Sequence, residues 1–289
     1  MENPLLLSKK AKRVLFYFLV VLCFSFTQAD AQNLIYVDSE ATGDNDGTSW
    51  TDAYDSLQTA LFNVNTNDTI WVAAGTYKPT NTTNRDTSFV IPDSVAVYGG
   101  FSGSEGSLGE RDWETNETIL SGDIGTVNDS TDNSYHVVYF DNVSDQTVLD
   151  GFTIIEGNAD GAYPEDNGGG IYLSASGSGN TCNPVIMNCI ISENTADGNG
   201  GGICVFADVG TSSPSFINCI ISGNYADAGG GIFQTQSSTY TDDYGYVASD
   251  FINCIITGNK ANLFGGAIYN YGSQDPSGET NPSFVNTTI

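Results

Sequence analysis

One heptapeptide recurs along the second half of the chain, and a repeat of this period restricts the fold to a stack of equivalent units. Three complete copies, Asn188–Asn194, Asn218–Asn224 and Asn253–Asn259, read Asn-Cys-Ile-Ile, then Ser or Thr, Glu or Gly, and Asn. A degenerate copy covers residues 152–158, and the chain ends within a further copy at 286–289. The steps between the second positions are 36, 30, 35 and 33 residues, for Thr153, Cys189, Cys219, Cys254 and Thr287. A constant motif with variable spacing indicates a fixed core path joined by loops of different lengths.

Glycine runs follow the copies and separate the strand-like stretches of each unit. They end in isoleucine and cover residues 168–171, 200–203, 229–232 and 265–268. Within one unit the strand-like stretches are Pro214–Asn218, Cys219–Ser222 and Gly231–Gln234, without helical periodicity. Three short strands per turn, each stacked on its equivalent one turn away, account for this pattern. The sequence therefore predicts an all-β chain folded as a right-handed parallel β-helix, which is a solenoid.

Stacking explains the constancy of the motif, because neighbouring turns of a parallel coil lie only about 4.8 Å apart. An inward ladder of small residues is expected at Thr153, Cys189, Cys219, Cys254 and Thr287. An inward aliphatic ladder is expected at Ile155, Ile191, Ile221, Ile256 and Ile289. Outward positions are expected at Ile190, Ile220, Ile255 and Thr288. At the bends, left-handed backbone and amides bonded to the next turn are expected at Asn194, Asn224 and Asn259.

Five cysteines follow the first 31 residues, and we interpret them as buried thiols, with disulfides as the alternative. They are Cys182, Cys189, Cys204, Cys219 and Cys254. Five is an odd number, and neighbours in register would be strained as a disulfide. Thiols are common in apolar cores.

The N-terminus has the pattern of a secretory signal peptide over residues 1–31. A basic segment ending at Arg13 precedes 13 apolar residues, Val14–Phe26, and Ala29 and Ala31 supply a small-x-small cleavage site. Thirteen residues are too few to span a bilayer, which needs about 20. We therefore expect an exported protein, secreted or at the cell surface in the outer membrane or outside it, with an uncleaved anchor as the alternative. No membrane insertion of the mature chain is expected.

The charge of the chain restricts its partners. Residues 1–31 hold four of the eight Lys and Arg residues and two of the 35 Asp and Glu residues, so the rest carries a formal charge of −29. Such a surface repels nucleic acid, anionic lipid and acidic polysaccharide, and it attracts Ca²⁺. The aromatic and β-branched content argues against disorder.

The segment before the repeats is expected to close one end of the coil. We assign residues 32–110 to an N-terminal cap with the first strands, and 111–289 to the repeats. Residues 53–62 have one apolar helical face, which predicts a short capping helix.

These motifs resemble those of right-handed parallel β-helix proteins of the pectate-lyase-like superfamily. Gly265–Ile268 matches the Gly-Gly-Ala-Ile element of polymorphic outer-membrane-protein repeats, whereas their Phe-x-x-Asn element is shortened here to Phe216–Asn218 and its equivalents. Ile35–Asp38, Gly47–Trp50 and Arg111–Trp113 are similar to segments that open exported β-helix proteins of the Bacteroidetes type. The resemblance implies the same fold and an exported surface protein.

Catalytic residues of the enzymes on this fold have no clear equivalents. A polysaccharide lyase needs a basic residue, and Arg111 and Lys260 are interpreted instead as cap packing and an exposed loop lysine. The Gly-His-Gly and Arg-Ile-Lys elements of polygalacturonases are missing, and His136 is interpreted as structural. Asp242 and Asp243 are adjacent in sequence, so they are poorly placed to act on opposite sides of a glycosidic bond. We predict no catalytic site.

Two kinds of binding site are predicted on loops. An aromatic and acidic loop is a candidate for ligand contact, with Tyr240, Asp242, Asp243, Tyr244 and Tyr246. Two acidic segments are candidates for calcium, with Asp44 and Asp46 in one and Asp160, Glu165 and Asp166 in the other.

We therefore expect an adhesion or carbohydrate-contacting scaffold without catalysis, whose partners are glycans or components of a host or cell surface. A polysaccharide-degrading lyase or glycoside hydrolase is one alternative, and a structural spacer of a larger surface protein is another. The chain stops within a repeat copy, so we also expect further turns in the full gene and self-association through the open C-terminal rung.

Overall fold

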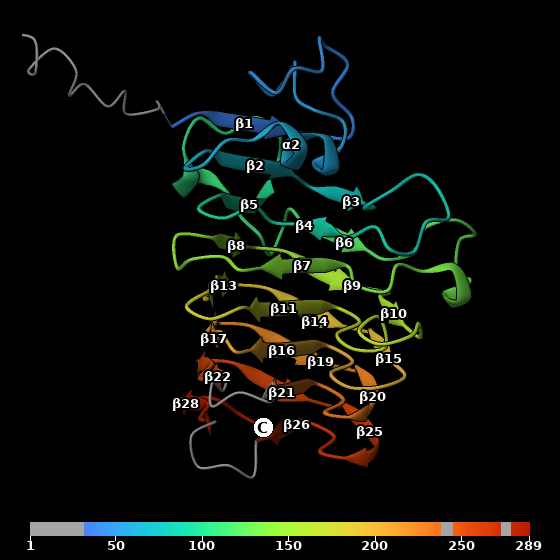
Figure 1. Ribbon diagram of the computed structural model, residues 1–289. Coiled ribbons are helices and arrows are strands. Elements are labelled where there is room, and N and C mark those ends of the chain that lie inside the picture. Colours follow the sequence, from blue (N-terminus) through green and yellow to red (C-terminus); the bar gives the residue numbers. More distant parts are fainter. Residues whose placement is uncertain (1–31, 238–244, 273–278) are drawn as a thin grey trace, which may run out of the picture. The chain divides into compact units, whose positions relative to one another are not determined.

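The computed structural model describes residues 32–237, 245–272 and 279–289, and all β-strand pairs in these ranges are parallel. The unit formed by residues 33–289 is a coil of about seven turns, in which the strands follow one another in sequence order from β1 to β28 (Figure 1). The predicted parallel β-helix is confirmed. None of the helices in the described ranges is long and apolar enough to cross a membrane.

Three large sheets form the walls of the coil, and we name them A, B and C. Sheet A contains β1 (Leu34–Val37), β2 (Thr69–Ala73), β5 (Ala96–Phe101), β8 (Val148–Asp150), β13 (Val185–Met187), β18 (Ser215–Ile217), β23 (Asp250–Ile252) and β28 (Ser283–Val285). Sheet B contains β3 (Gly75–Tyr77), β6 (Thr118–Ser121), β9 (Thr153–Ile155), β14 (Ile190–Ser192), β19 (Ile220–Ser222) and β24 (Ile255–Thr257). Sheet C contains β4 (Phe89–Val90), β7 (Val138–Asp141), β11 (Ile171–Ser176), β16 (Ile203–Asp208), β21 (Ile232–Ser237) and β26 (Ile268–Tyr271).

Two small sheets occupy corners of the coil. Sheet D, between B and C along the chain, contains β10 (Asn158–Ala159), β15 (Thr195–Ala196), β20 (Tyr225–Ala228) and β25 (Lys260–Phe264). Sheet E, between C and A, contains β12 (Thr181–Cys182), β17 (Thr211–Ser212), β22 (Tyr246–Val247) and β27 (Glu279–Thr280). From β8 onwards each complete turn therefore has five strands, two more than the sequence predicts, whereas the earlier turns β2–β4 and β5–β7 have the predicted three.

Inward-facing ladders fill the interior of the coil. Phe216 stacks on Phe251 at 4.9 Å between ring centroids, and Phe251 stacks on Phe284 at 5.2 Å. Ile191, Ile221 and Ile256 lie in register and are buried, as predicted. Each fully buried side chain of this size contributes about 1.5–3 kcal/mol.

The first copy of the motif is offset by one residue from the predicted alignment. Ile154, not Ile155, pairs with Ile191, and Thr153 pairs with the outward Ile190 instead of extending the cysteine ladder. Gly151 occupies the left-handed position that Asn188 takes one turn later, with φ values of 84° and 51°. The expectation for Ile155 and Thr153 is therefore wrong.

The asparagine ladder forms as expected, but its backbone differs from the expectation. Asn194 donates through Nδ2 to Oδ1 of Asn224 at 3.1 Å, and Asn224 donates likewise to Asn259 at 2.9 Å. The left-handed residue is the one before each asparagine, for example Glu193 with φ 58°, so the expected left-handed φ of Asn194 is wrong. The shift leaves the amide side chain pointing into the coil, where it bonds the next turn.

Glycine is required at the corner between sheets D and C. A Cβ on Gly202 would lie 2.6 Å from the carbonyl oxygen of Gly231 and 2.9 Å from Nδ2 of Asn224. Because real Cβ atoms do not approach backbone so closely, the glycine runs of the sequence mark this corner on successive turns.

The helix α2 (Leu57–Asn63) caps the first turn, and two short 3₁₀ helices, η1 (Leu108–Glu110) and η2 (Ser130–Asp132), lie in later loops. Ser56 caps α2 by accepting from the backbone N–H of Thr59, and Leu57, Ala60 and Leu61 are buried. The predicted helix is confirmed but begins at Leu57 and not at residue 53. The preceding Tyr54 instead forms a parallel bridge with Val37.

Candidate functional site

The loop predicted to contact a ligand lies mostly outside the described residues. Tyr240, Asp242, Asp243 and Tyr244 belong to that part. Tyr246 is described: it begins β22 in sheet E, and its side chain is exposed.

The first predicted calcium segment is an exposed turn in which the carboxylates bond the chain itself. Oδ1 of Asp46 accepts from the backbone N–H of Thr48 at 3.0 Å and from its hydroxyl at 2.7 Å. These bonds, the hydroxyl first, lower the pKa of Asp46. Asp44 is exposed, and its N–H donates to Asp52 at 3.1 Å. Asp46 therefore stabilises the turn through its carboxylate, whereas Asp44 takes part through its backbone N–H, and calcium binding there stays a prediction.

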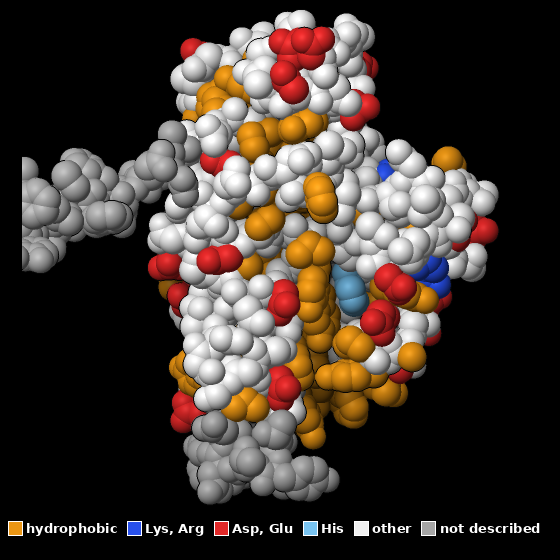
Figure 2. Space-filling model, turned by 45° about the horizontal axis from the view of Figure 1, so that its top comes forward, with side chains coloured by type: hydrophobic (Ala, Val, Ile, Leu, Met, Phe, Trp, Pro, Cys, Tyr) orange, Lys and Arg blue, Asp and Glu red, His pale blue; other side chains and the backbone are white. Residues whose placement is uncertain are grey.

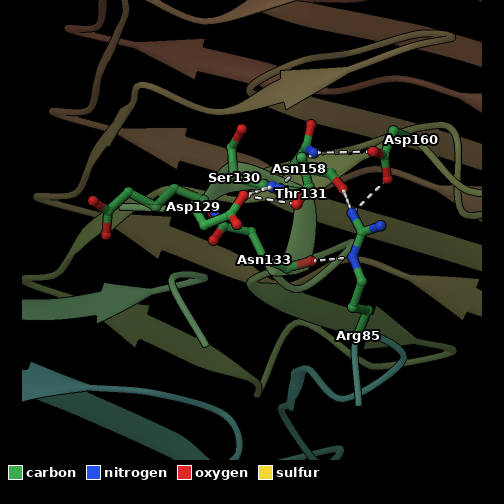
Figure 3. A network of polar contacts seen from close by, with 8 residues as sticks. Arg85, Asp129, Ser130, Thr131, Asn133, Asn158 and Asp160 are labelled. Carbon is green, nitrogen blue, oxygen red and sulfur yellow. Dashed lines mark hydrogen bonds and ion pairs between the residues drawn. The ribbon is translucent and has the colours of Figure 1, made fainter. Parts of the chain in front are cut away.

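In the second predicted segment, Asp160 is paired with Arg85 and takes part in a polar network (Figure 3). Nε of Arg85 donates to the carbonyl of Asn133 at 2.6 Å, and its Nη2 donates to the carbonyl of Asn158 at 2.9 Å. The guanidinium also lies 4.2 Å from the ring centroid of Tyr135. Arg85 therefore joins its own loop to residues 48 to 75 positions further along the chain.

Glu165 and Asp166 lie in the loop that follows this network. Burial raises the pKa of Asp166, and the nearby Glu165 and Asp197 raise it further. Within the described ranges, no group of three or more His, Cys, Asp or Glu residues is arranged to hold a metal ion. The calcium site therefore stays a prediction here as well.

Sheet C carries a feature that sequence reasoning missed: an outward column of apolar and aromatic side chains. Its members occupy equivalent positions on six successive strands: Val90, Tyr139, Tyr172, Cys204, Phe233 and Tyr269. Tyr139 and Tyr172 stack at 5.6 Å, and Tyr269 stacks with Phe264 at 5.4 Å. We call this set the sheet C column.

The sheet C column is accompanied by exposed aromatic and acidic residues. Tyr163 and Tyr271 are 68 % and 56 % exposed. Asp141 and Asp208, on β7 and β16, occupy outward positions further along the same strands. Figure 2 shows the result as a hydrophobic stripe in a hollowed surface, with acidic side chains on both sides.

A cleft of about 250 Å³ lies at the N-terminal end of the sheet C column, beside the histidine of Figure 2. The ring of His136 stacks on Tyr172 at 5.0 Å, and its Nδ1 lies 3.1 Å from the carbonyl oxygen of Gly168. Burial lowers the pKa of His136, so the ring is neutral at pH 7. Asp86 and Glu165 also line the cleft.

The pKa of Tyr172 is raised by burial first, and then by Cys204 and Tyr163. Its phenol is therefore neutral and able to donate a hydrogen bond. The cleft combines a neutral imidazole, neutral phenols and two carboxylates, which are groups that bind hydroxyl-rich ligands.

A sequence signal for the sheet C column did exist. Tyr172, Cys204, Phe233 and Tyr269 each follow the isoleucine that ends a glycine run, and the side chains along each of these strands alternate between inward and outward. The cleft had no such signal, because its walls combine β4 and β7 with residues of the loop around Glu165, which are far apart in sequence.

The two basic residues considered for catalysis have other surroundings. Arg111 is buried and paired with Asp150 at 2.6 Å between Nη2 and Oδ2, which agrees with its interpretation as cap packing. Lys260 begins β25 and is exposed, as expected. Neither residue lines the cleft beside His136.

A family model described as "Protein of unknown function (DUF1565)" matches residues 41–287. The chain belongs to this family. The DUF1565 match runs from the turn after β1 to the residues that follow β28, so it covers nearly all of the described coil. Neither the curated proteins nor the solved structures contain a match to this chain.

Proposed function

We propose that this DUF1565 protein is exported and contacts glycans without cleaving them, through the sheet C column and the exposed aromatic residues beside it. The observation that carries the proposal is the set of exposed and half-buried tyrosines Tyr139, Tyr163, Tyr269 and Tyr271, which lie beside the buried members of the column, Tyr172, Cys204 and Phe233. Pyranose rings present C–H faces that pack on aromatic rings, and tyrosine adds a hydroxyl for hydrogen bonding. The resemblance to pectate-lyase-like and outer-membrane surface proteins supports the same proposal.

The charge of the protein favours glycans without carboxylates. Asp141, Asp208, Glu165 and Asp166 lie around the column, and the chain after residue 31 has a formal charge of −29. An acidic polysaccharide would be repelled from this surface. We therefore expect neutral glycans to bind more tightly than uronic-acid polymers.

Glycan-array binding of residues 32–289 tests the proposal. Tyr271→Ala should weaken binding, because it removes an exposed ring beside the column. Tyr225→Ala is the matched control, since Tyr225 is an exposed aromatic residue on β20 in sheet D and is not a member of the sheet C column. Uniformly negative arrays, or equal losses for the two variants, would overturn the proposal and favour a structural spacer.

Glycan hydrolysis is a second candidate, and the cleft beside His136 favours it. Asp86 and Glu165 come from different loops and line one cleft, as the acid and base of a glycosidase must. Release of reducing ends from a polysaccharide panel, with loss of activity in Glu165→Gln, would support this function. The same panel with Asp242→Asn tests the acid pair predicted from the sequence. No release from any substrate would leave the non-catalytic proposal.

A further inference from the structure

A second concave site lies at the corner where the chain passes from sheet A to sheet B. None of its lining residues belongs to a strand of sheet C. It is a pocket of about 420 Å³, and Trp113, Glu114, Glu117, Ile190 and Asn218 are among its lining residues. None of its lining residues is a lysine, an arginine or a histidine.

The loop that carries Trp113 is held firmly against the coil. A Cβ on Gly100 would lie 2.7 Å from Cα of Trp113, and one on Gly151 would lie 3.2 Å from its Cβ. Both glycines have positive φ, 90° and 84°. They therefore allow the loop to approach the coil at a distance that side chains would prevent.

Asp112 stiffens the same loop from within. Its Oδ1 accepts from the backbone N–H groups of Glu114 and Thr115, both at 3.1 Å, and its own N–H donates to the carbonyl of Gly100 at 2.9 Å. These bonds fix the loop backbone, so Trp113 is held in position before any ligand arrives. Such preorganisation reduces the entropy cost of binding.

Arg111 supports the indole ring without making the pocket positive. Its guanidinium carbon lies 4.9 Å from the Trp113 ring centroid, and its Nη2 pairs with Asp150 at 2.6 Å. The charge of Arg111 is therefore already neutralised. Glu114 and Glu117, both exposed, make the pocket negative.

Polar groups of the pocket are partly used and partly available. Oε1 of Glu117 accepts the hydroxyl of Thr153 at 3.0 Å, which orients the carboxylate. Asn218 donates through Nδ2 to Oδ1 of Asn188 at 3.2 Å. An amide nitrogen has two donor hydrogens, so the exposed Asn218 can still bond a ligand.

We propose that this pocket binds a pyranose that carries a protonated amine, which is an amino sugar. Trp113 provides a fixed and partly exposed ring for the C–H face of the sugar, Glu117 an oriented carboxylate for the amine, and Asn218 an amide for a hydroxyl. A charged hydrogen bond between ammonium and carboxylate is stronger than a neutral one. The negative pocket, beside which the charge of Arg111 is already paired with Asp150, selects the amine over a neutral or acidic sugar.

Isothermal titration calorimetry with three matched ligands tests the proposal on residues 32–289. The ligands are the β-1,4-linked trimers of glucosamine, N-acetylglucosamine and glucose, at about pH 6, where an ordinary amine is protonated. We expect the glucosamine trimer to bind about tenfold or more tightly than the other two. Trp113→Ala should abolish this binding.

Glu117→Gln should reduce the affinity for the glucosamine trimer about tenfold while leaving the packing of Trp113 unchanged. Glu40→Gln, at an exposed acid outside the pocket, is the matched control and should have no effect. Equal affinity for the three trimers, no binding, or equal effects of the two glutamate variants would overturn the proposal. Tyr271→Ala should leave this binding intact, which separates it from the function proposed for sheet C.

Discussion

Arg111 and Asp150 are 39 residues apart in sequence and form an ion pair inside the protein, with 2.6 Å between Nη2 and Oδ2 and side chains 7 % and 4 % exposed. Arg111 also donates to the carbonyl of Gly99 at 3.0 Å, and Asp150 accepts from Nδ2 of Asn188 at 2.8 Å. The pair thereby connects the loop after η1 to sheet A and, through Asp150, to Asn188 in the next turn.

Arg111→Met should lower the free energy of unfolding by about 3–5 kcal/mol, because it leaves the buried carboxylate of Asp150 without its cation. Urea unfolding followed by circular dichroism measures this. Lys260→Met is the control, since Lys260 is exposed at the start of β25. Replacement of an exposed side chain of this kind usually changes the free energy of unfolding by at most about 0.5 kcal/mol. Equal effects of the two changes would contradict the prediction.

Asn224→Ala should destabilise the coil by roughly 3 kcal/mol or more. The amide of Asn224 accepts from the backbone N–H of Asn194 at 3.0 Å and donates to the carbonyl of Ile191 at 2.9 Å, so its removal leaves both groups buried and unpaired. Asn218→Gly removes the amide of an exposed asparagine and allows the same positive φ. It should therefore lower the free energy of unfolding by less than about 1 kcal/mol. The two changes are compared by chemical denaturation.

The five described thiols should not react with a disulfide reagent in the native state. All are free and buried, and burial raises the pKa of Cys182 to about 12 and that of Cys204 further. Reaction needs a thiolate that the reagent can reach. Thiolate is scarce at neutral pH for Cys182 and Cys204, whereas the hydrogen bond with Cys219 lowers the pKa of Cys254 to about 7, so Cys254 is protected by its burial. Titration with Ellman's reagent should therefore release the coloured thiolate of the reagent only after denaturation. Rapid labelling of the native protein would refute the expectation.

Stability should fall with acid below about pH 6.5, and His136 should account for part of the fall. The folded-state pKa of His136 lies below its unfolded value of 6.5, because burial disfavours the charged ring. Between these two pKa values the unfolded chain binds more protons, so the free energy of unfolding decreases as pH falls through this window. His136→Phe should flatten the profile in the range below pH 6.5. An unchanged slope in melting experiments would assign the fall to other groups.

Asp166→Asn should raise the melting temperature at neutral pH. The pKa of Asp166 is raised by burial and by Glu165 and Asp197, so its charged form costs stability, and this cost appears as pH rises through the folded pKa. Millimolar Ca²⁺ should relieve the same repulsion in the unmodified chain and have a smaller effect in the variant. Asp145→Asn, at an exposed carboxylate, is the control. Identical melting curves with and without Ca²⁺ would remove the predicted calcium site.

The repeat predicted the fold well because stacking requires equal residues at equal positions. Ile191, Ile221 and Ile256 are in register as expected. The offset at Ile154 arose because Gly157 takes the ladder position in the degenerate copy, and its N–H, not a side chain, bonds Asn194 at 2.9 Å. Two small corner sheets were missed, since two-residue strands such as β12 and β17 have no periodicity to detect.

The candidate sites were harder to predict, because they depend on loops that are far apart in sequence and adjacent in space. Alternation within β11 and β16 contains enough information for the sheet C column. The cleft beside His136 combines residues from Asp86 to Tyr172, and the pocket beside Trp113 needs two glycines that let one loop approach the coil. A single sequence does not indicate that the segments of the cleft, or those of the pocket, lie side by side.

The parallel sheets connect each turn only to the turn before and the turn after. The molecule is therefore close to a one-dimensional chain of neighbours, whose stability is a sum of nearest-neighbour terms. A substitution that breaks the contact of the last turn with its neighbour should unfold that turn alone and leave the other turns folded. A substitution that separates two turns in the middle, such as a larger side chain at Gly202, should divide the coil into two blocks that unfold independently.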